Sequence, residues 1–231
     1  MKKLVIFGLG KIGEVAYRHI LRDATHEVVG FTCDAGWMDG RTSHFGLPAW
    51  PFEEIERHVP PGSAEMFVAI GYHGLNAARA AKCAEAKAKG YRLASYVSPR
   101  ADTGPWLEVG ENSLILDGVG IQPGVRLGND VSLWNNVLVG HHSTVGDHCW
   151  IAAGATLGGG VSLGERSFVG LNATVGGEVT LGAECFLGGG CLVLKDAPAK
   201  SVFVARATDR FRLESDAFVR MTAMPSLAMP K

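Results

Sequence analysis

The sequence predicts an α/β domain followed by an all-β solenoid, a parallel β-helix of stacked three-sided coils. A six-residue period of aliphatic residues and glycines over residues 109–193 predicts the solenoid. An apolar strand, a glycine-rich turn and a helix at the start of the chain predict the α/β domain. We assign residues 1–100 to the first domain, 101–197 to the β-helix, and 198–231 to a tail with a short helix near 213–218.

Composition and charge limit the possible functions. The 231 residues are 47% hydrophobic and carry a formal net charge of -1. Because this charge creates no long-range field for a polyanion, we expect no nucleic-acid partner and favour small-molecule chemistry. No apolar run reaches the roughly 18 residues of a membrane span, so we expect a cytoplasmic protein without a signal peptide. The five cysteines form no Cys-x-x-Cys pair, and we expect no metal.

Every sixth residue from 109 to 193 is Val, Ile or Leu. The fifteen positions are Val109, Ile115, Ile121, Leu127, Leu133, Val139, Val145, Ile151, Leu157, Leu163, Val169, Val175, Leu181, Leu187 and Val193. Glycine follows ten of them, and we interpret this glycine as a turn in each hexad. Glycine at this frequency excludes a helix.

The fifth position of each hexad is small or β-branched, as at Val137, Ala155 and Cys185. Two inward side chains per hexad suit a short strand on one side of a triangular prism, and three hexads close one coil. Successive coils then pair as parallel strands about 4.8 Å apart. Residue 159 is therefore expected directly beside residue 141, with the third position of each hexad at a corner and pointing outward.

The chain starts with an apolar strand at residues 4–7, a turn that contains Gly8, Gly10 and Gly13, and a helix that ends near Arg22. Such a turn brings backbone N–H groups and a helix N-terminus to a phosphate. The three glycines are therefore candidate substrate-binding residues. The alternative is that they serve only close packing of the helix on the strand.

Further elements complete the first domain. A second strand at residues 28–33 ends at Asp34, where a carboxylate is suited to bind a ribose. A third strand at 66–70, a helix at 75–89 and a last strand at 91–97 are predicted. Because a dinucleotide fold needs two βαβαβ halves, about four strands favour a mononucleotide or nucleotide-sugar over NAD.

Four residues follow the third strand at the ligand-facing end of the sheet: Gly71, Tyr72, Asn76 and Arg79. The amide of Asn76 and the guanidinium of Arg79 are suited to bind a uracil ring or a phosphate. Helix capping by Asn76 is the competing interpretation.

The repeat, an aliphatic residue, Gly, two variable positions, a small residue and one more, resembles that of the hexapeptide-repeat acyltransferases, which implies left-handed winding. Both halves together resemble the sugar O- and N-acyltransferases of bacterial surface-glycan pathways, the family of sialic acid O-acetyltransferase and bacillosamine N-acetyltransferase. The resemblance implies acetyl-CoA as the acyl donor, bound by the β-helix at a homotrimer interface. It also implies a sugar or nucleotide-sugar acceptor in the first domain, contacted by Asp34 and Gly71.

Acyl transfer from a thioester needs a base, and His141 matches the family's catalytic histidine in the segment Gly140-His141-His142-Ser143-Thr144-Val145-Gly146-Asp147. An imidazole exchanges protons near neutral pH, and a corner position exposes it. His142 is the second choice. An exposed polar corner residue without a catalytic role is the alternative.

Glycines below His141 suggest an oxyanion donor and a channel. The backbone N–H of Gly159 is placed to polarise the thioester carbonyl, and Gly177 lies one coil further. The columns Gly140/Gly158/Gly176 and His141/Gly159/Gly177 form a bare stripe for the pantetheine arm, unless turns alone require these glycines. Basic residues that follow the last coil are candidate partners for CoA phosphates, or a solvated tail: Lys195, Lys200, Arg206, Arg210 and Arg212.

The expected mechanism is direct transfer in a ternary complex, because no cysteine has an activated setting. The sequence departs from the family in two places. His142 stands where relatives carry a carboxylate, and Val204 to Ala207 replace the usual Gly-x-Pro-Ala. The partner of His141 and the site of the CoA adenine are therefore open.

Three other functions fit parts of the sequence. A hexapeptide-repeat carbonic anhydrase needs three zinc-binding histidines with a His-x4-His pair, which His141, His142 and His148 do not form. A non-catalytic nucleotide-sugar-binding scaffold is a second alternative. An NAD oxidoreductase leaves the β-helix without a role.

Overall fold

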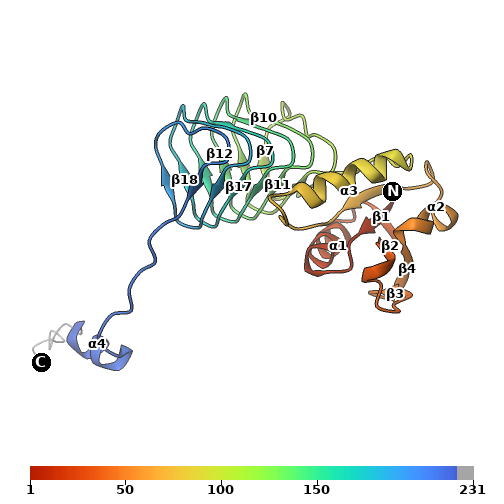
Figure 1. Cartoon of the computed structure of the whole chain (residues 1–231), viewed down its shortest axis with the longest axis horizontal. Helices are drawn as coiled ribbons and strands as arrows, with labels where there is room; N and C mark the ends of the chain where they lie inside the picture. Colours follow the sequence, from red (N-terminus) through yellow and green to blue (C-terminus); the bar gives the residue numbers. More distant parts are fainter. Residues whose placement is uncertain (223–231) are drawn as a thin grey trace, which may run out of the picture.

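The computed structural model describes residues 1–222 and shows an α/β domain, a β-helix and a C-terminal segment (Figure 1). The α/β domain contains β1 (Lys3–Phe7), α1 (Lys11–Asp23), β2 (Glu27–Cys33), η1 (Ala35–Trp37), β3 (Ser43–His44), β4 (Leu47–Pro51), η2 (Phe52–Glu54), α2 (Ile55–His58), β5 (Glu65–Val68) and α3 (Ala77–Ala88). The C-terminal segment ends in α4 (Ser215–Thr222), so a short helix near the end of the chain is confirmed with shifted bounds. Within the part described, no helix has the length and apolar character needed to cross a membrane.

The sheet of the first domain has the order β3-β4-β2-β1-β5. The strands β4, β2, β1 and β5 are parallel, and only β3 is antiparallel, to β4. The sequence analysis missed β3 and β4. Their signal is weak because β3 has two residues and β4 contains Pro48 and Pro51, which normally argue against a strand.

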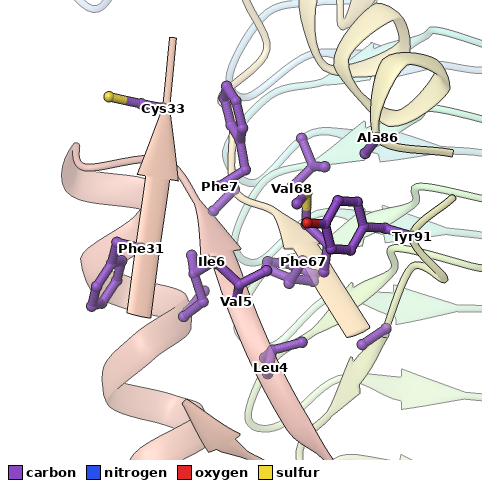
Figure 2. Packing of buried hydrophobic residues seen from close by; sticks show 14 of the residues in the cluster. Leu4, Val5, Ile6, Phe7, Phe31, Cys33, Phe67, Val68, Ala86 and Tyr91 are labelled. Carbon is purple, nitrogen blue, oxygen red and sulfur yellow. The ribbon is translucent and has the colours of Figure 1, made fainter. Parts of the chain in front are cut away.

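The core of this domain forms around β1, whose alternate side chains are buried on both faces of the sheet. Figure 2 shows Leu4, Val5 and Ile6 beside Phe31 of β2 and Phe67 of β5. Helix α1 packs on this layer through Ala16 and Ile20. A strand buried on both faces is typical of a parallel sheet covered by helices.

Three sheets form the β-helix. One contains β6 (Tyr96–Val97), β8 (Leu114–Ile115), β11 (Ser132–Leu133), β14 (Trp150–Ile151), β17 (Phe168–Val169), β20 (Phe186–Leu187) and β22 (Val202–Phe203). The second contains β7 (Asp102–Thr103), β9 (Gly120–Ile121), β12 (Leu138–Val139), β15 (Thr156–Leu157), β18 (Thr174–Val175) and β21 (Leu192–Val193). The third contains β10 (Arg126–Leu127), β13 (Thr144–Val145), β16 (Ser162–Leu163) and β19 (Thr180–Leu181).

The predicted register between coils is confirmed. Val139 pairs with Leu157, and Ile121 pairs with Val139, each at an offset of one 18-residue coil. Side chains at the fifth position, including Val137 and Ala155, are buried beside the aliphatic first position. The interior is therefore a continuous apolar column.

The predicted turn recurs in the hexads, but the recurring glycine is not the residue with the turn conformation. The left-handed backbone lies two positions later, at the fourth residue of each hexad, whether that residue is Asn136 (φ 60°), His142 (φ 59°) or Gly160 (φ 70°). The recurring glycine is instead required by contact between coils. A Cβ on Gly158 would lie 2.6 Å from the backbone nitrogen of Gly177.

The border between the domains also differs from the prediction. In the expected strand at 91–97, Leu93 forms an isolated parallel bridge with Met66 of β5, whereas Tyr96–Val97 is a strand that pairs with β8 in the β-helix. The β-helix thus begins at residue 96 and ends at Phe203, outside the predicted bounds of 101 and 197. The last strand of the first domain's sheet is β5.

Replacing Gly146 by Ala tests the contact between coils, because its Cβ would lie 2.6 Å from the backbone nitrogen of Glu165. We expect Gly146→Ala to lower the free energy of unfolding by about 1–3 kcal/mol, as overpacking does. Gly36→Ala is the control, since nothing lies within 4 Å of its Cβ position. Urea denaturation measures both variants, and equal stabilities would refute the packing explanation.

Candidate active site

His141 lies at the exposed corner between β12 and β13, and its ring covers Gly159 of the next coil. A Cβ on Gly159 would lie 2.5 Å from both Cε1 and Nε2 of His141. The two backbones are joined by a hydrogen bond from the Gly160 N–H to the His141 carbonyl of 2.8 Å. The predicted juxtaposition of residues 141 and 159 is confirmed.

The N–H of Gly159 has no acceptor within residues 1–222, although its carbonyl accepts a hydrogen bond from the N–H of Glu178. At a different corner, side chains of the next coil accept the hydrogen bond from this position. There the N–H of Glu111 donates to Asn129 Oδ1 and the N–H of Asn129 donates to Asp147 Oδ1, each one coil further along. Because residue 177 is glycine, it has no side chain to do the same for Gly159.

The glycines of the bare stripe differ in environment, because some are required by packing and Gly177 is exposed. Gly140 and Gly158 are required by packing, since a Cβ on either would lie 2.5–2.6 Å from the backbone of the next coil. Gly177 is exposed, and its Cβ position is 3.2 Å from the Gly159 carbonyl oxygen. Further along, the stripe ends at the exposed side chains of Leu194 and Lys195.

The environment of His141 leaves one ring nitrogen unengaged. Its Nδ1 lies 3.2 Å from Nδ1 of His142, and its backbone N–H donates to Gln122 Oε1 at 2.9 Å. Within the described chain, Nε2 has no hydrogen-bond partner and points over Gly159. A free imidazole nitrogen beside an unpaired backbone N–H is suited to deprotonate a nucleophile whose target carbonyl that N–H polarises.

The glycines of the first turn lie at the carboxyl end of β1 and differ in what they contact. A Cβ on Gly13 would lie 2.1 Å from the Gly8 carbonyl oxygen, and one on Gly8 would lie 2.7 Å from the Ala69 carbonyl oxygen. Packing therefore requires these two, as the alternative interpretation stated. Gly10 faces open space.

Asp34 lies at the carboxyl end of β2, where its carboxylate pairs with Lys82 Nζ at 2.7 Å. Burial opposes the charge of Lys82, but the carboxylates of Asp34 and Glu85 outweigh it, so its pKa is raised. Beside Asp34 lies a groove of about 350 Å³, lined by Ala35, Met38, Gly40, Arg41, Thr42, Ala49, Trp50 and Pro51.

Gly71 and Tyr72 follow β5 at the same edge of the sheet. A Cβ on Gly71 would make only ordinary contacts, the nearest to Ile12 Cγ1 at 3.8 Å. Tyr72 is 51% exposed, and its ring centroid lies 4.6 Å from that of Phe168 on the β-helix. This edge of the first domain therefore lies open beside the outer face of β17.

The predicted ligand role of Arg79 and Asn76 is wrong, because both are buried between the domains. Arg79 Nε donates to Asp130 Oδ1 at 2.8 Å, and its side chain is 2% exposed. Its other nitrogens donate to Asn76 Oδ1 and to the carbonyls of Asp130 and His148. Asn76 occupies the N-cap position of α3 but makes no side-chain cap, so the capping interpretation holds for position only.

Lys82 and Arg79 are the residues whose roles the sequence analysis missed. They lie three positions apart on α3, which is one helical turn, so Arg79 reaches the β-helix while Lys82 reaches Asp34. The pairing of positions 79 and 82 was visible in the sequence. Their partners are distant in the chain, and no local pattern identifies them.

Other groups in the described residues are structural. Burial raises the pKa of the Cys149 thiol to about 12 and that of Cys33 to about 11, so neither is a ready nucleophile. His19, Asp23 and Asp117 lie close enough to hold a metal, but Arg22 and Arg100 bind both carboxylates. His148 bonds Asp130 at another corner, away from His141.

The comparisons with known proteins support the hexapeptide repeat and the fold. Residues 108–141 and 142–177 match the family described as bacterial transferase hexapeptide (six repeats). Residues 160–195 match the hexapeptide repeat of succinyl-transferase. A search of curated proteins finds no match.

Solved structures match nearly the whole chain. Perosamine N-acetyltransferase from Caulobacter crescentus, a histidine-to-asparagine variant in complex with CoA and GDP-perosamine, is 27% identical with a TM-score of 0.78, covering 87% of this chain and 93% of its own. The acetyltransferase domain of PglB from Neisseria gonorrhoeae is 25% identical with a TM-score of 0.76, covering 87% and 96%. WeeI from Acinetobacter baumannii, at 18% identity and a TM-score of 0.74, shows the fold alone.

The parallel sheets and the repeat fit a left-handed β-helix, and together with these matches they define a hexapeptide-repeat acyltransferase. Within that class, the solved structures that match most of this chain at 25–27% identity include sugar N-acetyltransferases, to which the chain is similar.

The buried pair of Arg79 and Asp130 yields a prediction about the joint between domains. Arg79→Met leaves the Asp130 carboxylate buried without its cation, so we expect a loss of about 3–5 kcal/mol in unfolding free energy. Lys2→Met, which breaks the exposed pair with Glu65, is the control and should cost far less. Similar losses in urea denaturation would contradict the proposed importance of the buried pair.

Proposed function

We propose that the protein transfers an acetyl group from acetyl-CoA to an amine or hydroxyl of a nucleotide-linked sugar, with His141 as the general base. The observation that carries this proposal is the free Nε2 of His141 above Gly159, whose N–H has no acceptor within residues 1–222. An amine is the favoured nucleophile, because the structurally similar enzymes are N-acetyltransferases.

The transfer follows from the positions of these groups. Nε2 of His141 takes a proton from the acceptor as its nitrogen or oxygen attacks the thioester carbonyl. The Gly159 N–H, and Gly177 on the next coil, are the proposed donors to the oxyanion and to the pantetheine arm. When the carbon–sulfur bond breaks, the proton held by His141 passes to the leaving thiolate.

The acceptor's nucleotide is assigned to the carboxyl edge of β1, β2 and β5. Gly10 faces open space there, Asp34 and Gly71 stand at two strand ends, and the groove at Arg41 and Trp50 adjoins Asp34. Ligands of open parallel sheets bind at this edge. Lys195 at the end of the bare stripe is the proposed partner for a CoA phosphate.

Within one chain, the proposed nucleotide-binding edge and the corner of His141 do not come together. The first domain packs on the sheet of β14 and β17 and on the corners of Asp117 and Asp130. His141 lies at the remaining corner, and within residues 1–222 no hydrogen bond or ion pair joins that corner to the first domain. We therefore propose a homotrimer in which a neighbouring copy supplies the acceptor domain.

Variants at the proposed site test the chemistry. We expect His141→Asn to lower kcat for thiol release from acetyl-CoA by about 100-fold or more, because the base is lost. Gly159→Ala should do the same by displacing the ring, since its methyl group would lie 2.5 Å from Nε2.

The assay uses a panel of GDP-, UDP- and dTDP-amino sugars, with Lys2→Met, at the opposite end of the sheet, as the control that keeps wild-type rates. Thermal melting shows whether each variant is folded. If no acceptor releases CoA and His141→Asn binds nucleotide-sugars like wild type, the protein is a scaffold.

Mixed oligomers test the shared site. Chains carrying His141→Asn and chains carrying Asp34→Ala are inactive alone in the acceptor assay. Co-expressed at equal amounts, they should recover about a quarter of wild-type activity, because random mixing restores that share of sites between neighbours. Recovery near zero would place the whole site within one chain.

A further inference from the structure

The rings of His141 and His142 face each other through like nitrogens. Their Nδ1 atoms are 3.2 Å apart, and the rings meet edge to face with centroids 5.4 Å apart. A neutral imidazole has one nitrogen that donates and one that accepts, so one Nδ1 carries the hydrogen and the other receives it. This contact is the one side-chain hydrogen bond of the His141 ring within residues 1–222.

The backbone of the preceding coil holds His142 in place. Its φ is 59°, and its N–H donates to the Pro123 carbonyl at 3.0 Å. Its ring covers Gly124, where a Cβ would lie 2.8 Å from Cδ2 of His142. The two histidines therefore extend in opposite directions, His142 over the preceding coil and His141 over the next, and meet at Nδ1.

Two proton arrangements fit this contact, and they differ at the nitrogen over Gly159. If His141 donates from Nδ1, its Nε2 carries a lone pair and is able to take a proton. If His142 donates instead, Nε2 of a neutral His141 already carries the hydrogen and is unable to act as a base.

We propose that His142 is a positioning residue that accepts the Nδ1–H of His141 and so presents an unprotonated Nε2 above Gly159. This inference rests on the proposed function of His141. When Nε2 takes the proton, the Nδ1–H bond to His142 is kept, and His142 stays neutral throughout. Protons therefore balance on His141 alone.

No carboxylate among the described residues hydrogen-bonds to either ring, so His142 is the side chain placed to accept from Nδ1 of His141. The Oδ1 atoms of Asn and Asp are separated from Cα by the same number of bonds as Nδ1 of histidine. Both residues also tolerate the left-handed backbone of position 142. Substitutions at position 142 can therefore keep a neutral hydrogen-bond acceptor, replace it with a charged one, or remove it.

Four variants of the full chain separate acceptance of a hydrogen bond from filling of space. His142→Asn keeps a neutral acceptor and should retain kcat within about 3-fold, and His142→Asp should equal or exceed wild type because a carboxylate stabilises the imidazolium. His142→Gly suits the backbone but lacks the acceptor, and His142→Phe keeps a ring without one. Both should lose about 10- to 100-fold in kcat with KM for acetyl-CoA unchanged.

A high kcat for His142→Phe together with a low kcat for His142→Asn would overturn the proposal, since a ring alone would then suffice. A second readout does not depend on turnover. Nitrogen-15 NMR of the histidine rings at about pH 8, where ordinary histidines are neutral, reports which nitrogen carries hydrogen.

We expect the Nδ1–H form for His141 in wild type and in His142→Asn, and a mixture of forms in His142→Gly. The Nε2–H form in wild type would refute the inference. Activity retained by His141→Asn would instead refute the proposed function, so the two failures are distinguishable.

Discussion

The structure depends on the pairing of each β-helix coil with the next at an offset of 18 residues. That register places like positions in columns, as with Ile121, Val139 and Leu157 in the interior. The backbones approach so closely that the second position must be glycine in several coils, for example at Gly146 and Gly158. The same closeness places the ring of His141 on the backbone of Gly159, so the candidate active site is a consequence of the packing.

Helix α3 connects the two halves of the molecule. Arg79 enters the β-helix and uses its donors on Asp130 and nearby carbonyls, while Lys82 on the next turn holds Asp34 at the edge of the sheet. Buried ion pairs contribute modestly to stability but are costly to break, so this joint fixes the geometry between the domains. The edge that we assign to the nucleotide is thereby held at one place relative to the coils.

The sides and corners of the three-sided coil have different surroundings. One side carries Trp150 and Phe168, whose apolar rings are covered by the first domain. The corner of His141 faces away from that contact and stays open. We propose that a neighbouring copy completes the site for the two substrates at this corner, so the proposed oligomer and the proposed chemistry depend on each other.

The sequence by itself determined the β-helix, its register and the juxtaposition of residues 141 and 159, because a strict six-residue repeat fixes which residues of successive coils lie side by side. It could not identify β4, whose prolines hide a strand. The left-handed residue of each hexad was overlooked, although the fourth position is Gly, Asn, Asp or His in most hexads. Only the tertiary structure decided that Arg79 joins domains and that His142 contacts His141, because ring orientations and partners distant in the chain arise from packing.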